Sequence, residues 1–358
     1  MAIDKFILFN RWRYGNIVFD VVIIFLSVFI FSCTKSGYNT KSLPDKLVVL
    51  AEITAGDTAN IPIGSTLAAG TGNTIIFSKL DNVDAIITGQ GAGTQTLLLN
   101  TTSDFTSNPM AVYSGTSVFV NNNTYTLSAT DPLLGSIEAT TVVPDSFSAK
   151  KTETETDDLN GKKVLRFAFT INDAAAQKNY YIFDAVKQLV NTFKYFYWQG
   201  TRYDYNTQQG YNLYQQVQNN PNVVLYTDTI LTHQYLQLNV FTRDNNTANA
   251  GIGTLDSAYS RIFITDSLFN GHQYETEFYI SRDYFKAADS TQKGVVQVRV
   301  KSVSKELYDY LFQYERYNLN FGNFPVGNLS SPQGNIKNGF GIFGGSARKQ
   351  WSFYYDSL

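Results

Sequence analysis

Apolar and polar residues alternate with a period of two in the second half of this chain, which is the pattern of strands with one buried face. In residues 163–171 (KVLRFAFTI), Leu165, Phe167 and Phe169 share one face, and Arg166 lies on the other. The same alternation recurs in YLQLNVF and VVQVRVKSV. It predicts an antiparallel β domain over residues 146–358.

Short strand candidates fill the first part of the chain and are separated by Gly, Asn and Asp clusters. They are LVVLAEI, TIIFSKL, DAIITG, TQTLLL, TYTLSA and IEATTVV. Several short strands at such spacing predict an immunoglobulin-like β-sandwich over residues 47–145. A polar stretch follows Pro144 and marks the expected domain boundary.

One helix is predicted in the mainly β chain, at SKELYDYLFQYERY. Ser304 is a suitable N-cap, and Glu306 lies in the first turn, where the helix dipole favours an acid. Leu307, Leu311 and Tyr314 form one apolar stripe. We expect this stripe to pack on a sheet.

The first residues combine a basic flank with an apolar run at residues 21–31, which predicts a secretory signal peptide over residues 1–32. An uncleaved signal anchor is the alternative. The run ends in IFSC, which resembles a bacterial lipobox, and Cys33 is the chain's one cysteine. We therefore expect lipidation of Cys33, a membrane anchor and a flexible tether over residues 33–46. Which side of the membrane the protein faces stays open.

Composition narrows the class of protein. A formal net charge of −2 with 16% charged residues gives no basic surface for nucleic acid. Aromatic residues reach 15% of the chain, which suits pleated surfaces and is typical of an exported all-β protein.

Residues 193–216 are rich in aromatic rings with polar amides and glycines between them. The candidate binding residues are Tyr195, Tyr197, Trp198, Tyr203 and Tyr205. Such amphipathic rings favour recognition of a glycan, a peptide or a protein partner. Trp198 is the strongest candidate, because the turn residues after it would display it. The alternative is that about half of these rings fill the core.

Residues for catalysis or metal binding are sparse. His233 and His272 lie about forty residues apart, which is not the spacing of a zinc site. Glu275 and Glu277 share a strand face and could suit glycoside hydrolysis, but we favour a solvated outer face. We expect no catalytic residues, no metal and no cofactor.

Gly339, Gly341 and Gly344 in NGFGIFGG have the spacing of a dinucleotide-binding loop. That loop needs a helix starting at its last glycine, with an acidic residue further on. The remaining residues read as a turn and an aromatic strand, so we expect no nucleotide site here.

Several segments, in order, share the pattern of one family, among them KLVVLAEITAG, YTLSATDPLLGSIEATTVVP, VRVKSVSKELYDYLFQY and GNIKNGFGIFGG. Together they resemble the Bacteroidota lipoprotein family classed as domain of unknown function 4249 (DUF4249). The resemblance implies an outer-membrane location and a TonB-dependent receptor as partner. It also implies that the glycines are a structural signature, shaping a turn or bulge before the last strand while Phe340, Ile342 and Phe343 pack inward.

The function expected from these observations is that of a non-enzymatic accessory protein. It would bind or capture a nutrient together with a TonB-dependent outer-membrane receptor. The alternative is a structural or adhesive envelope protein that binds other proteins only.

Overall fold

The computed structural model describes residues 45–66, 77–89, 93–102, 108–159, 161–174, 177–248, 259–286, 294–321 and 332–354. These residues fall within one compact unit, Asp45–Leu358. The predicted signal peptide, Cys33 and all of the tether before residue 45 lie outside the described residues. Within the described part of the chain, no helix has the length and apolar character needed to cross a membrane.

The described residues between 47 and 143 lie mostly in strands, as the short apolar segments predict. These strands are β1 (Leu47–Thr54), β2 (Thr58–Thr66), β3 (Phe77–Lys79), β4 (Asp84–Gly89), β5 (Gly93–Leu99), β6 (Ala111–Val118), β7 (Asn123–Asp131) and β8 (Gly135–Val143). Two of them, β2 and β6, were not among the predicted strands.

The rest of the described chain is also mainly strand. Its strands are β9 (Ser148–Leu159), β10 (Lys162–Asn172), β11 (Tyr180–Trp198), β12 (Thr201–Asp204), β13 (Tyr226–Gln237), β14 (Val240–Phe241), β15 (Arg261–Thr265), β16 (Gln273–Ser281), β17 (Val295–Val303) and β18 (Phe340–Tyr354). Its helices are α3 (Gln208–Val217), α4 (Lys305–Phe321) and two 3-10 turns, Asp266–Leu268 and Arg282–Phe285. The prediction of a mainly β protein is confirmed. Helix α4 was predicted, whereas α3 was not.

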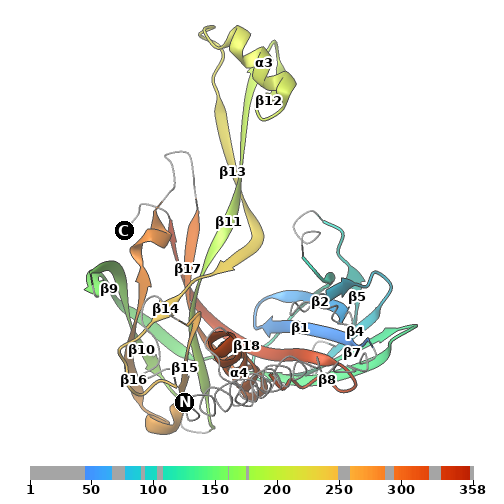
Figure 1. The fold of residues 1–358 in the computed structure, drawn as a ribbon, viewed down its shortest axis with the longest axis vertical. Coiled ribbons are helices and arrows are strands. Elements are labelled where there is room, and N and C mark those ends of the chain that lie inside the picture. The colour runs from blue at the N-terminus through green and yellow to red at the C-terminus, as the bar shows by residue number, and fades with distance from the viewer. Residues whose placement is uncertain are drawn as a thin grey trace, which may run out of the picture. The chain divides into compact units, whose positions relative to one another are not determined.

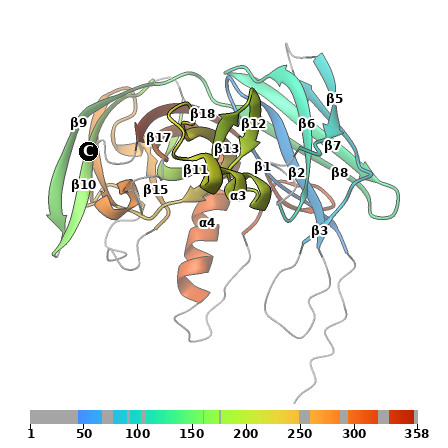
Figure 2. The same ribbon diagram turned by 90° about the horizontal axis from the view of Figure 1, so that it is seen from above.

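Strand β18 joins the two parts of the chain. It pairs antiparallel with β17 along one edge and parallel with β1 along the other (Figures 1 and 2). As a result, strands from both parts belong to one 14-stranded sheet, in the order β12-β11-β17-β18-β1-β2-β6-β5-β4-β7-β8 with three side branches. A separate sheet has the order β14-β16-β10-β9. The immunoglobulin-like topology predicted for residues 47–145 is not confirmed.

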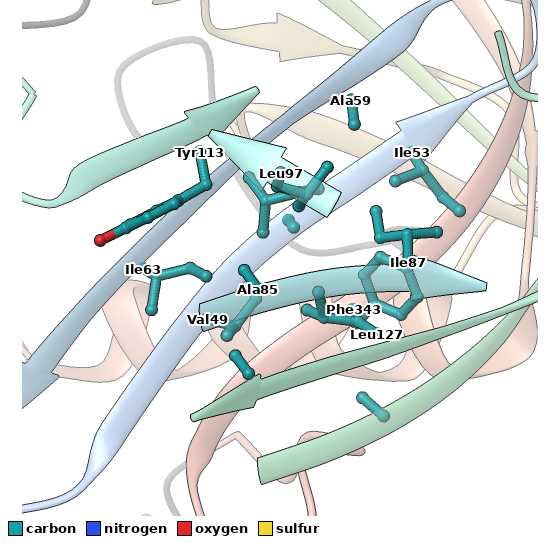
Figure 3. Packing of buried hydrophobic residues seen from close by; sticks show 14 of the residues in the cluster. Val49, Ile53, Ala59, Ile63, Ala85, Ile87, Leu97, Tyr113, Leu127 and Phe343 are labelled. Carbon is teal, nitrogen blue, oxygen red and sulfur yellow. The ribbon is translucent and has the colours of Figure 1, made fainter. Parts of the chain in front are cut away.

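Two large hydrophobic cores follow from this arrangement. The first is lined by β1, β2 and β4–β8, with Ile63, Leu127 and Phe343 among its buried residues (Figure 3). The second lies between β10 and β16 on one side and β11 and β17 on the other. Because Phe343 comes from β18, the first core includes residues from beyond the predicted boundary at 145/146, and that boundary stays a prediction.

A smaller core lies under α4. Leu307 is buried and Leu311 packs against the same cluster, so the prediction that this stripe packs on a sheet is confirmed for both. Tyr314, at the end of the predicted stripe, is exposed. The Ser304 hydroxyl accepts a hydrogen bond from the Leu307 amide at 3.4 Å, in the manner of an N-cap.

Strands β11 and β17 cover the second core with one face and carry a group of charged residues on the other. Asp184 is fully buried and accepts two hydrogen bonds from Arg299, at 2.6 and 2.8 Å. The Lys301 ammonium lies 3.2 Å from Asp184 and 2.9 Å from Glu52 on β1. Glu52 also accepts a hydrogen bond from Ser346 at 2.7 Å. This network therefore links β11, β17, β18 and β1.

Candidate functional site

Strand β11 is long enough to leave the sheet and continue as a ribbon. Its residues from Tyr181 to Gln188 pair with β17, whereas its residues from Val190 to Tyr195 pair with β13. Figure 1 shows β11 and β13 continuing together past β17, with β12 and α3 at their far end. The aromatic segment predicted at residues 193–216 forms this tip.

A tight hairpin connects β11 to β12. Trp198 pairs with Thr201, so the loop has two residues, Gln199 and Gly200. Both have positive φ, 50° and 80°, as a two-residue hairpin turn of type I′ requires. The turn fixes the register, and this register places alternate rings on opposite faces of the tip.

The first face of the tip is covered by α3. Phe196 is fully buried, and its ring contacts Tyr203 and Tyr214 at centroid distances of 5.6 and 5.2 Å. Tyr205 makes edge contacts with Tyr211 and Tyr214 from α3. These rings form a small cluster of their own, in which Phe196 is buried and the tyrosines are partly exposed. The alternative that about half of the rings fill the core stays a prediction.

Close packing holds α3 in place. The Thr207 side chain caps the helix, because its hydroxyl accepts a hydrogen bond from the Gly210 amide at 3.0 Å. A Cβ atom at position 210 would lie 1.8 Å from the backbone oxygen of Asp204. Only glycine allows the helix to approach β12 this closely.

The second face of the tip is open. Tyr195 pairs across the strands with Tyr226, and directly opposite residues share a face. Their rings are nearly parallel, 19° apart at 5.4 Å, while Tyr197 stands at 85° to Tyr195 and at 77° to Tyr226. Tyr197 and Tyr226 are 48% and 44% exposed, and Phe193 on the same face is exposed as well. We call Phe193, Tyr195, Tyr197 and Tyr226 the open aromatic face.

Arg202 lies across this face. Its guanidinium carbon is 3.8 Å from the centre of the Tyr195 ring, in a cation–π contact. The Nη2 atom of Arg202 lies 3.8 Å from a carboxylate oxygen of Asp228. Loss of solvent, and then the negative charge of Asp228, raise the pKa of the Tyr195 hydroxyl above its ordinary value. Tyr195 is thus a neutral ring held between Arg202 and Tyr226.

The five predicted binding residues are divided between the two faces. Tyr195 and Tyr197 lie on the open aromatic face. Tyr203 and Tyr205 lie with the helix, and strand alternation puts the partly buried Trp198 on that side too. The predicted binding residues did not include Phe193, Tyr226 or Arg202. Strand alternation around Tyr195 could have separated the two sets of rings, but Tyr226 is found only through the pairing of β11 with β13.

The carboxylates considered for hydrolysis are engaged elsewhere. Glu277 accepts hydrogen bonds from Arg166 at 2.8 Å and from the Tyr279 hydroxyl at 2.5 Å. Glu275 accepts one from Gln273. His272 is exposed in the turn before β16, and the side chain of His233 lies outside the described part of the structure. Within the described ranges, no group of three or more His, Cys, Asp or Glu residues could hold a metal ion.

The three predicted glycines lie at β18, not in a nucleotide loop. Gly341 has φ of 101°, and a Cβ there would lie 1.9 Å from the Val49 oxygen. Cβ atoms at Gly339 and Gly344 would also clash, with Leu47 and Leu307. At all three positions glycine thus lets neighbouring groups lie closer than a side chain would allow.

A turn at Asn338 and Gly339 comes directly before the last strand, as predicted, whereas Gly341 and Gly344 lie within that strand. Phe340 begins β18, and seven residues from there pair with β1 without a shift in register. Ile342 and Phe343 are buried as expected, but Phe340 is 46% exposed. Its ring lies under the Lys46 ammonium at the start of the strand.

Comparison with known proteins agrees with the resemblance seen in the sequence. Residues 35–352 match the model of the family described as domain of unknown function (DUF4249). No curated protein matches the chain.

Proposed function

We propose that this chain, which belongs to the DUF4249 family, is a non-enzymatic, lipid-anchored envelope protein that binds its ligand at the tip of the β11–β13 ribbon. The observation that carries this proposal is the open aromatic face. Its rings are displayed at the end of a ribbon, while a separate set of rings under α3 supports the tip. Tyr and Arg are enriched among the residues that contribute most of the binding energy in protein interfaces.

Lipidation at Cys33 supplies the anchor in this proposal. We predict that Cys33→Ala abolishes labelling by an alkyne fatty acid and leaves an unprocessed or soluble precursor. Ser32→Ala is the matched control, because it keeps a small residue before the cysteine and should label normally. Labelled Cys33→Ala protein would show that the anchor lies elsewhere.

The second element of the proposal is a TonB-dependent outer-membrane receptor as partner. It comes from the family resemblance, and the exposed tip is a means of capturing what the receptor transports. We predict that the tagged full-length protein, extracted from native outer membranes in mild detergent, brings down a TonB-dependent receptor in a stoichiometric amount. A preparation without such a receptor would favour the alternative, a structural or adhesive envelope protein.

A further inference from the structure

We infer that the open aromatic face binds an uncharged glycan. This inference rests on the proposed function and names the class of ligand for the same surface. Tyr197 and Tyr226 offer exposed rings at 77° to each other, with centroids 6.1 Å apart. A sugar ring has a flat face of C–H groups and a rim of hydroxyls. It can lie on one tyrosine ring, contact the other with its edge and direct its hydroxyls to the polar groups around them.

Charge on the ribbon favours a neutral ligand. Residues 190–237 contain two cations, Lys194 and Arg202, and two anions, Asp204 and Asp228, so their formal charges cancel. Next to the rings, the Arg202 Nη2 atom lies 3.8 Å from an Asp228 oxygen, so a positive and a negative group stand side by side. An anionic or cationic ligand would gain little Coulomb energy here. The same paired groups can exchange hydrogen bonds with sugar hydroxyls.

The size of the face favours a glycan over a folded protein. A fully covered aromatic side chain buries about 150–250 Å². Phe193, Tyr197 and Tyr226 are each less than half exposed, so together they offer roughly 300 Å². A standard protein interface takes about 800 Å² from each partner. The open aromatic face matches one or two sugar rings instead.

The rings are also held in position before any ligand arrives. Tyr195 is fixed between Arg202 and Tyr226, and the hairpin turn sets the position of Tyr197. Because binding then costs little side-chain ordering, weak contacts to a sugar suffice for useful affinity.

Affinity electrophoresis of the full-length protein tests the inference. Gels would contain dextran, pullulan, xyloglucan or mixed-linkage β-glucan as neutral polymers, and polygalacturonate as the charged comparison. We expect at least one neutral polymer to retard the wild type. Tyr197→Ala and Tyr226→Ala should each weaken that retardation about tenfold or more. Tyr314→Ala, which removes an exposed tyrosine from α4, should leave retardation unchanged.

The variant Tyr197→Phe shows whether a loss of binding in Tyr197→Ala comes from the missing ring or from misfolding. It keeps the stacking surface and should bind within a few-fold of wild type, with an unchanged melting temperature. The inference is overturned if no neutral polymer retards the wild type, if only polygalacturonate does, or if the alanine variants bind normally. It is also overturned if these variants lose the receptor while polymer binding stays the same, which would make the tip a protein interface. Co-purification of the wild-type protein with a TonB-dependent receptor tests the proposed function independently of these polymer measurements.

Discussion

Replacing Asp184 with alanine is expected to lower the free energy of unfolding by about 3–5 kcal/mol, because it leaves buried cations without their partner. Asp184 is fully buried, and Arg299 and Lys301 both lie within 3.2 Å of it. Chemical denaturation with urea measures the loss. Asp309→Ala is the control, because its pair with Lys305 is solvent-exposed and should contribute less than about 1 kcal/mol.

The dependence of stability on pH checks the same network. Burial alone would raise the pKa of Asp184, but the positive charges of Arg299 and Lys301 outweigh burial and hold that pKa well below its usual range. The pKa of Glu52 is lowered in the same way, against burial, chiefly by Lys301. A lowered pKa in the folded state stabilises the protein above about pH 4 and ceases to do so as the pH falls further. A wild type whose stability is flat down to pH 2 would contradict this account.

Replacing Gly341 with valine is expected to reduce stability by roughly 3 kcal/mol or more, through backbone strain and a steric clash together. The φ angle of 101° is unfavourable for any side chain, and the Cβ would lie 1.9 Å from the Val49 oxygen. Relief of that clash requires β18 to move away from β1. Thermal unfolding and the yield of soluble protein measure the effect.

Gly135→Ala isolates the contribution of backbone strain. Gly135 also has positive φ, 82°, but nothing lies within 4 Å of the position that its Cβ would take. It should lose only about 1–2 kcal/mol. If Gly341→Val were no more destabilising than Gly135→Ala, the close contact between β1 and β18 would not be the reason for a glycine at position 341.

Alternation predicted the strands whose two faces differ, and it failed where other residues interrupt the pattern. Segment 84–89 matches β4 and segment 295–303 matches β17 at both ends. Strand β2 escaped prediction because Pro62 and Gly64 interrupt it, and both are depleted in strands. On β17, Gln297 and Lys301 fall on the predicted polar face but are buried as well. Period two separates the faces of a strand but does not say whether both are covered.

The aromatic tip shows the same limit at the candidate site. The sequence identified the segment that forms the tip, and it favoured Trp198 as the displayed ring because a turn follows directly. The helix that covers the Trp198 side was missed, since α3 has Gly210 in its first turn and is rich in amides. Tyr226 becomes part of the open aromatic face only after β13 returns along β11, more than twenty residues later.

The position of β18 has a consequence for the order in which the chain can fold. Thr54 and Ser346 are hydrogen-bonded across a separation of 292 residues. Closing a loop of that length costs on the order of 5 kcal/mol in chain entropy. Whether the chain emerges from the ribosome or from the export machinery, β1 comes early, but one of its edges has no native partner until β18, the fifteen-residue last strand, has also emerged. Completion of the first core is thus a late event, and a chain that stops before residue 340 would leave β1 and β17 each with an open edge.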